Sequence, residues 1–314
     1  MRRSRVLFLT TLFISSYHLS SAQDADTTTV SEVGTDLSFA DSLSIFNLID
    51  SMLQQADDNS SQLVLRLTYN SNVMSTGRTL GIQNFGLSPG VSYYHKSGLY
   101  ADLSGYWSRD FDPSYYLTVA SVGFMKSFSH LFSLLAGYDR YFYRFGGDGY
   151  IPYSNAFSFT PSVDFNPISI SASYSFYFGD ANAHRIMPGI SLIIEKKKFL
   201  KLDRVSFTPG FFLLLGDETI TTLEYIPPKS VAEAVENYRK YGTRFGVALH
   251  DTNVFGLMNY AFSVPVTVNH RNWGFSFSYT YNVPKALPGE PLILSKSSYL
   301  SGSITYFIGF NQDK

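Results

Sequence analysis

Apolar and polar residues alternate with a period of two along most of the chain after residue 60. The clearest example is residues 153–179, YSNAFSFTPSVDFNPISISASYSFYFG, in which two alternating runs flank Asn166 and Pro167. In the second run one face carries Ile170, Tyr174 and further apolar residues, and the other face carries a file of serines. Such alternation predicts two strands joined by a tight turn.

The two faces of these strands differ in an unusual way. The solvent face of a soluble antiparallel sheet usually carries Lys, Glu and Thr, whereas the polar face here is small and hydroxylic. An apolar outer face with a small polar inner face is what a barrel in lipid needs. The pattern therefore favours a transmembrane β-barrel over a soluble sandwich.

Counting the alternating runs over residues 61–314 predicts about twelve strands, an even number that returns both termini to one side. The facing of residues 115–127 and 131–144 is not fixed by their pattern, while Met258 and Phe275 are predicted to face outward with the other apolar residues of their strands. The connections alternate in length. The short ones fall at residues 95–98, 127–130, 166–167, 195–203 and 270–272, and the long ones at 75–81, 109–114, 146–152, 180–184, 217–243 and 284–298. This asymmetry predicts short periplasmic turns and longer outer loops.

Composition agrees with this prediction and excludes several classes of function. The chain is 45% hydrophobic and 17% aromatic but only 16% charged, and beyond its first two dozen residues it has no apolar run long enough for a spanning helix. A net charge of -1 gives no electrostatic basis for binding nucleic acid. Without Cys the chain can form no disulfide or thiolate zinc site.

Residues 1–22 have the three parts of a secretory signal peptide. Arg2, Arg3 and Arg5 precede an apolar core at residues 6–14, and small residues follow up to Ala22. The alternative, a membrane anchor, conflicts with the short apolar core. We expect the mature chain to begin at Gln23.

Residues 23–60 are polar and form a predicted periplasmic leader. Within it, residues 41–56 place Leu43, Phe46 and Leu53 at helical spacing, which predicts a short amphipathic helix. Its role is open: it plugs the barrel, lies under the periplasmic mouth, contacts a partner, or is a loosely ordered leader.

Together the signal, the alternating strands, the asymmetric connections and an aromatic final strand, residues 299–310 (YLSGSITYFIGF), resemble the bacterial outer-membrane β-barrel superfamily. The resemblance covers about four fifths of the chain and points to no subfamily. It implies location in the outer membrane, contact with its lipid, and recognition of the last strand by the barrel assembly machinery. Many members end on the aromatic residue, whereas four residues follow Phe310 here.

Four predicted strands share a central proline, at Pro89, Pro161, Pro188 and Pro209. Proline removes a hydrogen-bond donor from the ladder and belongs at edges or bulges. We interpret these prolines as repeated bulges, with an internal duplication as the alternative.

Projecting the alternation inward gives a set of charged candidates for the lumen lining: Arg66, Asp102, Asp164, Arg185, Glu195 and Arg204. Both signs are present. One interpretation is a pore lining that filters small polar solutes, and the other is that opposite charges pair and fill a narrow interior.

The longest predicted loop, residues 217–243, contains a helix signal. Ser230 followed by Glu233 is a capping box, and Val235 and Tyr238 continue an apolar edge. Ser230, Glu233 and Tyr238 therefore mark a candidate constriction over the outer mouth, or a helix that packs on the rim.

These features predict a narrow channel for passive or selective passage of small polar solutes, with a structural or interaction barrel as the alternative. A lipid hydrolase is a third hypothesis, because some members of the superfamily are enzymes that use Ser, His and Asp. The histidines beyond the signal are His95, His130, His184, His250 and His270, and none stands beside a recognisable serine motif or at metal-ligand spacing. We therefore predict no catalytic site, no metal and no cofactor.

Overall fold

The computed structural model describes residues 60–71, 86–109, 112–129, 131–144, 153–290 and 294–310. The predicted signal peptide (residues 1–22) and the predicted leader helix (residues 41–56) lie outside these ranges.

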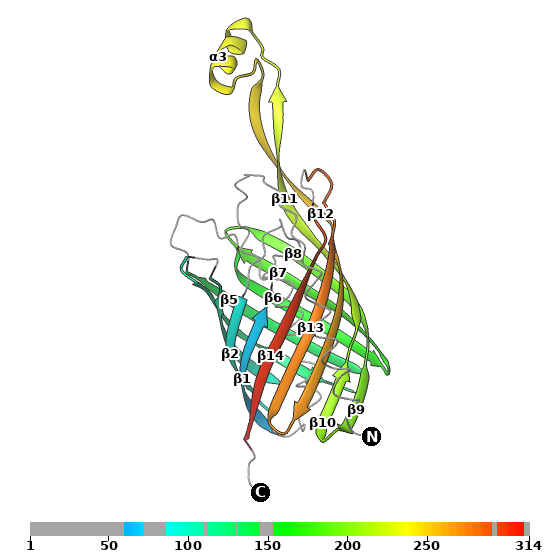
Figure 1. Ribbon diagram of the computed structural model, residues 1–314. Helices are drawn as coiled ribbons and strands as arrows, with labels where there is room; N and C mark the ends of the chain where they lie inside the picture. Colours follow the sequence, from blue (N-terminus) through cyan, green and yellow to red (C-terminus); the bar gives the residue numbers. More distant parts are fainter. Residues whose placement is uncertain are drawn as a thin grey trace, which may run out of the picture. The chain divides into compact units, whose positions relative to one another are not determined.

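All strands of the described residues belong to one antiparallel sheet, shown in Figure 1. They are β1 (Ser61–Asn70), β2 (Gly86–Tyr94), β3 (Leu99–Trp107), β4 (Tyr115–Ser127), β5 (Phe132–Tyr143), β6 (Tyr153–Phe165), β7 (Ile168–Gly179), β8 (Asn182–Leu192), β9 (Ile194–Phe199), β10 (Leu202–Phe207), β11 (Gly210–Ile226), β12 (Gly246–His270), β13 (Trp273–Pro284) and β14 (Ser297–Phe310). Each strand up to β8 pairs with its sequence neighbour, β1 also pairs with β14, and β11 pairs with both β8 and β12. The sheet therefore closes on itself as a barrel.

Twelve strands form the barrel wall, as predicted. The short strand β9 continues the line of β8, and β10 precedes β11 in the same way. The pairing register carries across both junctions, because Ser191 lies opposite Gly210 and Ile194 lies opposite Phe207. The junction residue Pro209 has no N–H to donate, which interrupts the ladder without ending the strand.

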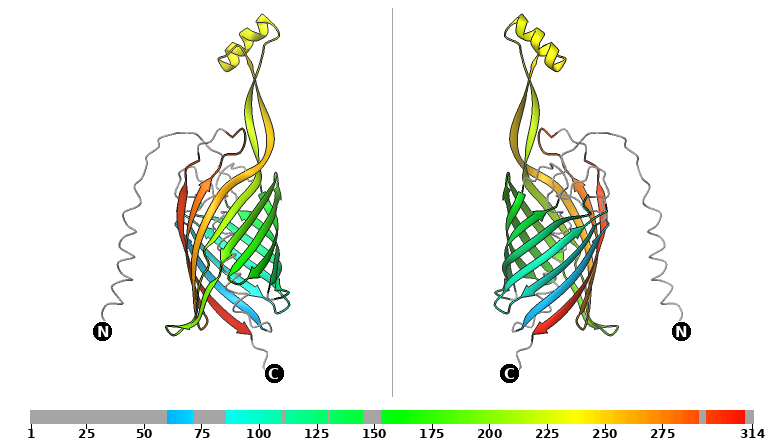
Figure 2. Two further views of the ribbon diagram at one scale, coloured as in Figure 1. Left: turned by 90° about the vertical axis from the view of Figure 1, so that its right-hand side faces the viewer. Right: turned by 90° about the vertical axis from the view of Figure 1, so that its left-hand side faces the viewer.

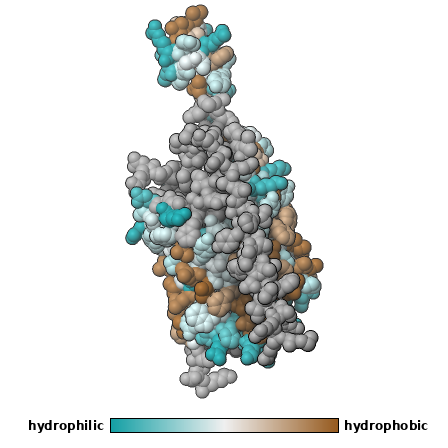
Figure 3. All heavy atoms as spheres, in the orientation of Figure 1, coloured by the Kyte–Doolittle hydropathy of each residue, from teal (hydrophilic) through white to brown (hydrophobic). Residues whose placement is uncertain are grey.

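Apolar side chains face away from the barrel interior, as the alternation predicted. Ile170, Tyr174 and Phe275 are 46%, 40% and 45% exposed, although each lies within a fully paired strand. Their sequence neighbours on the other face are small and polar. In Figure 3 apolar residues gather on the outer wall of the barrel. The hydrophobic surface is therefore the outside of the cylinder.

Aromatic side chains cluster on this outer face near both ends of the strands. Near one end, Phe157 stacks on Phe178 with ring centroids 5.5 Å apart, and Phe176 lies 4.9 Å from the ring of His184. Near the other end, Trp273 lies 4.7 Å from Tyr306. Two aromatic girdles that flank an apolar band are a property of barrels in a bilayer, where amphipathic rings lie at the headgroup level.

The prediction that the four strand prolines mark bulges is wrong. Pro89 lies opposite Leu67 in a regular ladder with β1. On its other side residues 88 and 89 have no paired residue on β3, but the pairs before and after this gap, Leu87 with Trp107 and Gly90 with Ser104, are in the same register. Pro161 and Pro188 show the same behaviour towards β7 and β11. A missing N–H thus opens a gap towards one neighbour only, without inserting a residue. The register shifts of the described sheet lie elsewhere.

One of these shifts reverses a predicted facing. In the pairing of β11 with β12, Leu214 lies opposite Asn259 and Leu215 lies opposite Leu257, so that Met258 is an extra residue on β12. Met258 is fully buried inside the barrel, whereas the alternation predicted that it faces outward. A bulge of this kind places two consecutive residues on nearly the same side of a strand.

The register also fixes the facing of β4 and β5, which the sequence left open. Ala120 of β4 lies opposite Leu103, which faces outward, so Ala120 also faces outward and the next residue, Val119, faces inward. Tyr141 of β5 lies opposite Val119 and therefore also faces inward. Val119 and Tyr141 are both buried. The inner face of these two strands therefore carries large apolar and aromatic residues beside Ser121 and Asp139, which explains why their sequence alternates poorly.

Short turns and the two terminal strand ends share one end of the barrel, here called the terminal end (Figure 2). One predicted turn there, residues 195–203, is instead the hairpin of β9 and β10, which reverses at Leu200 and Lys201. Its lysine run does not alternate in polarity, so the sequence resembled a loop. Backbone pairing with β10 nevertheless makes it a strand.

The longest predicted loop is largely a two-stranded ribbon. Beyond Gly216, β11 pairs only with β12, and this pairing continues to Ile226 opposite Gly246. The helix α3 (Val231–Tyr241) lies at the tip, as predicted: the Ser230 hydroxyl accepts a hydrogen bond from the Glu233 N–H, and Gly242 ends the helix in a left-handed conformation. No helix of the described residues is long and apolar enough to cross a membrane.

A charge placed on the outer wall tests the assignment of the two faces. We expect Phe277→Arg, at an outward position that is 51% exposed, to lower the free energy of unfolding in lipid vesicles by about 2–4 kcal/mol, because the guanidinium must enter the hydrocarbon. Urea titration of the refolded protein measures this quantity. Phe277→Leu, which keeps an apolar group, is the matched control, and an equal loss in both variants would contradict the assignment.

Candidate functional site

The inner face of the barrel is the candidate site, and one half of it is a strip of small hydroxyl and amide side chains. This polar wall is formed by β12, β13, β14, β1 and β2. Its side chains hydrogen-bond across neighbouring strands: Ser278 to Ser301 at 2.7 Å and Asn259 to Asn282 at 2.8 Å. Because most of these residues are short and uncharged, the wall is polar without carrying many charges.

Arg66 and Asp102, two of the predicted lining residues, meet inside the barrel although β2 lies between their strands. The Arg66 Nη2 is 3.2 Å from the Asp102 Oδ1 and donates a 2.8 Å hydrogen bond to the Ser104 hydroxyl. Ser104 in turn donates to the other Asp102 oxygen at 2.6 Å. Gly90 makes the crossing possible, since a Cβ there would lie 2.9 Å from the guanidinium.

Glu195 and Arg204 also form an ion pair, near the terminal end. Arg185 pairs outside the predicted set: it lies 3.4 Å from both Asp217 and Glu218, at the base of the ribbon, and its side chain is only 6% exposed. Among the described residues Asp164 has no basic partner. Five of the six predicted charges are therefore in ion pairs.

On the other half of the inner face an aromatic cluster lies beside the serines of β6 and β7. Tyr106, Tyr116 and Tyr141 are buried together with Leu117 and Val119, and further tyrosines pack against this cluster. The rings of Tyr106 and Tyr116 lie 6.4 Å apart. We call this surface, on β3 to β7, the aromatic wall.

Tyr100 shows how a large ring fits on the aromatic wall. It stacks on Tyr94 with ring centroids 5.8 Å apart and extends over Gly123 and Gly137 of the next two strands. A Cβ at Gly123 would lie 2.6 Å from the Tyr100 ring and 2.3 Å from the Ala136 carbonyl oxygen. The absence of side chains at these glycines lets the ring lie flat along the wall.

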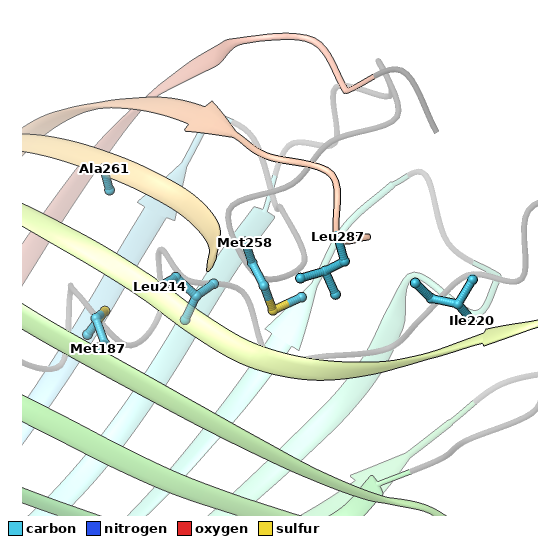
Figure 4. Packing of buried hydrophobic residues seen from close by; sticks show 6 residues of the cluster. All are labelled: Met187, Leu214, Ile220, Met258, Ala261 and Leu287. Carbon is cyan, nitrogen blue, oxygen red and sulfur yellow. The ribbon is translucent and has the colours of Figure 1, made fainter. Parts of the chain in front are cut away.

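A third group of side chains narrows the interior at the end opposite the termini. Met187, Leu214, Ile220, Met258, Ala261 and Leu287 form one buried cluster, shown in Figure 4. Leu287 comes from the segment after β13 and reaches Met258. It passes over Gly256, where a Cβ would lie 2.8 Å from the Leu287 Cδ2. This end of the barrel therefore carries an apolar cluster beside the ion pairs of Arg185.

The predicted constriction residues lie elsewhere. Ser230 caps α3, the Glu233 carboxylate accepts a 2.7 Å hydrogen bond from the Lys229 N–H, and Tyr238 is 67% exposed. All three lie at the tip of the ribbon, and no residue of α3 is buried. Their role as a constriction stays a prediction that the fold of this segment does not support.

The described histidines lie in separate parts of the fold: the His95 Nδ1 lies 2.8 Å from the Ser97 hydroxyl, and the His270 Nδ1 lies 4.0 Å from the Asp203 carboxylate. The His184 Nδ1 lies 2.9 Å from the Tyr174 hydroxyl, and its ring stacks on Phe176 in the outer aromatic girdle. His250 lies in the ribbon opposite Thr222. Within the part of the chain that the structure describes, no three His, Asp or Glu side chains gather as metal ligands.

Sequence reasoning missed the aromatic wall, the partners of Arg185 and the contribution of Leu287. Asp217 and Glu218 follow the last clearly alternating residues of β11, so they were assigned to a loop. Gly137 and Asp139 were available as a signal, since a glycine and a carboxylate two residues apart suggest an inner face. The apolar residues on both faces of β5 obscured it.

Comparison with known proteins adds little beyond this geometry. No family model matches the chain, and no curated protein matches its sequence. Among solved structures, a KdgM porin covers 78% of this chain and 98% of its own at 10% identity, with a TM-score of 0.42. A NanC porin covers 78% of this chain and 98% of its own at 9% identity, with a TM-score of 0.41. OccD1 (OprD) covers 81% of this chain and 96% of its own at 9% identity, with a TM-score of 0.33. At these scores the assignment of the barrel rests on the strand pairing described above.

Removing one member of the central ion pair tests whether the interior is packed. We expect Arg66→Met to lower the free energy of unfolding by about 1–3 kcal/mol, because Asp102 then loses its cationic hydrogen-bond partner inside the barrel. Adding Asp102→Asn should recover much of this loss. Urea titration in lipid vesicles measures both variants, and additive losses in the double variant would show that the two groups do not interact.

A glycine under Tyr100 offers a second test. We expect Gly123→Ala to lower the free energy of unfolding by about 1–3 kcal/mol, since the new methyl group overlaps the Ala136 carbonyl and the ring. Gly309→Ala is the matched control, because nothing lies within 4 Å of a Cβ at that position. Equal stability of the two variants, measured as above, would be inconsistent with the packing of the aromatic wall.

Proposed function

We propose that this chain is an outer-membrane β-barrel that forms a narrow channel for small polar solutes along its polar wall. The observation that carries the proposal is the strip of buried Ser, Thr and Asn side chains on the inner face of β12, β13, β14, β1 and β2. Short hydroxyl and amide groups replace part of the hydration shell of a polar solute and bind it weakly enough for release.

The packing of the interior supports a narrow passage. The aromatic wall occupies the opposite side of the lumen, and the cluster around Leu287 lines the outer end. A barrel of twelve strands lies between the filled eight-stranded barrels and the open sixteen-stranded ones. The proposed solutes are therefore small, and the expected conductance is low.

The charges of the interior favour cations. Arg66 and Arg204 are matched by Asp102 and Glu195, so they contribute little net field. Asp164 remains without a basic partner among the described residues, and Arg185 faces two carboxylates. The remaining charge of the lumen is negative, which raises the local concentration of cations.

The proposed location follows from the outer surface. Closed antiparallel barrels with an apolar outer band and two aromatic girdles are the spanning structures of bacterial outer membranes. In this arrangement the terminal end faces the periplasm and the ribbon extends outward. The signal peptide at residues 1–22 would direct secretion, and β14 would carry the signal for the barrel assembly machinery.

A structural or interaction barrel without transport is the second candidate. The ribbon and α3 favour it, because exposed apolar side chains such as Val231 and Tyr238 lie at the tip of the ribbon, beyond the strands of the barrel wall. The paired charges of the interior agree with both candidates. Conductance separates them, since only a channel passes ions.

The test is conductance of the purified, refolded protein in planar lipid bilayers. We expect discrete low-conductance steps and, across a KCl gradient, a reversal potential that indicates preference for K⁺ over Cl⁻. Asp164→Asn removes one negative charge of the lumen that has no basic partner among the described residues, and should move the reversal potential towards zero. Glu224→Gln is the matched control, because it removes an exposed carboxylate of the ribbon rather than of the lumen.

Folding of each variant is checked first by far-UV circular dichroism and by protection from protease in vesicles. Correctly folded protein that gives neither conductance steps nor flux of small sugars in liposomes would refute the channel and leave the interaction barrel. A reversal potential that responds equally to both substitutions would remove the role assigned to Asp164.

A further inference from the structure

The β9–β10 hairpin carries the densest positive charge in the sequence. Four lysines, Lys196, Lys197, Lys198 and Lys201, fall within six residues, whereas the whole chain has a net charge of -1. All four are exposed. Lys197 lies 3.8 Å from Glu195, but the other three have no carboxylate within ion-pair distance among the described residues. Most of this charge is therefore available to a partner.

The hairpin extends past its neighbours at the terminal end. β9 pairs with β10 alone, and the last contact with the preceding turn is the hydrogen bond from the Ile193 N–H to the Pro167 carbonyl at 2.6 Å. On the other side, the Asp203 carboxylate accepts a hydrogen bond from the Arg271 N–H of the turn between β12 and β13. The lysines lie beyond these contacts.

Its position relative to the apolar band is given by the outward-facing residues. Ile190, Leu192 and Ile194 face outward and are 44–54% exposed, and the next outward residue is Lys196. The ammonium group of Lys196 lies over the Phe199 ring, 4.7 Å from its centroid. An apolar row that ends in Lys beside an aromatic ring corresponds to the border between hydrocarbon and headgroups.

The turn itself keeps large side chains where glycine would fit better. Lys198, Leu200 and Lys201 have φ angles of 54°, 52° and 68°. Two-residue hairpin turns with positive φ at both positions normally contain Asn and Gly. Leu200 is also 77% exposed. A strained turn that displays Leu and Lys, where Asn-Gly would suffice for folding, indicates a contact outside the chain.

We propose that the β9–β10 hairpin binds anionic phospholipid headgroups of the leaflet at the terminal end. The lysines pair with the phosphates, while Phe199 and Leu200 enter the region between headgroups and acyl chains. Flexible ammonium groups at the headgroup level suit this ligand, because each adds electrostatic attraction to an anionic surface without requiring a fixed geometry. The proposal rests on the membrane barrel of the proposed function but not on solute passage.

The test uses the quenching of Trp273 fluorescence by brominated lipids. The chain has two tryptophans, so Trp107→Phe leaves Trp273 as the single reporter. Trp273 is 44% exposed on the outer wall and follows Arg271, the hydrogen-bond partner of the hairpin, by two residues. The full chain is refolded into vesicles that contain either brominated phosphatidylglycerol or brominated phosphatidylcholine at equal mole fraction.

We expect stronger quenching by brominated phosphatidylglycerol than by brominated phosphatidylcholine. The triple variant Lys196→Gln, Lys198→Gln, Lys201→Gln should lower the binding constant for phosphatidylglycerol, relative to that for phosphatidylcholine, by at least about tenfold. Lys96→Gln with Lys126→Gln is the matched control, since Lys96 lies in another turn of the same end and Lys126 lies near the end of β4 at that end. The control should keep the preference. Salt at high concentration should weaken it.

Several outcomes would overturn the proposal. Equal quenching by both lipids in the parent protein, or a preference that the triple variant retains while folded, would do so. Displacement by inorganic phosphate beyond that by chloride at equal ionic strength would assign the site to a free anion instead. Absence of quenching by either lipid would instead show that the barrel is not in the bilayer, and the proposed function would fail with it.

Discussion

Hydrogen bonding of the backbone is the constraint on which the structure depends. Water cannot hydrogen-bond the backbone N–H and C=O groups of a strand that lies in an apolar environment. Each such strand must therefore pair with a neighbouring strand on both sides. The pairing of β1 with β14 over ten residue pairs, and of β11 with β12, meets this requirement by closing the sheet. Alternation of side chains, girdles and a polar interior all follow from that closure.

The closed wall leaves an interior that must be filled or hydrated, and the chain does both. On one side, short hydroxyl and amide groups bond along the wall. On the other, tyrosines lie flat over glycines, and Arg66 crosses Gly90 to reach Asp102. Large side chains that run along the wall, instead of projecting to the axis, line the lumen while keeping the interior polar on one half.

Two segments depart from closure, and both continue a hairpin beyond the strands beside it. At the terminal end this produces the β9–β10 hairpin, whose free edge carries lysines. At the other end it produces the ribbon of β11 and β12, whose tip carries α3. Charged residues on a free strand edge oppose pairing with another chain, so the lysines of β9 are compatible with an exposed edge as well as with a lipid surface.

The sequence by itself determined the class of fold, the number of strands, the end at which short turns lie, and the helix capped by Ser230. These depend on local period and turn chemistry, which one strand carries alone. Tertiary structure decided which strands extend beyond their neighbours, that Met258 faces inward, and which carboxylates pair with Arg185. Register, bulges and contacts across the lumen depend on residues far apart in the chain, and no local pattern encodes them.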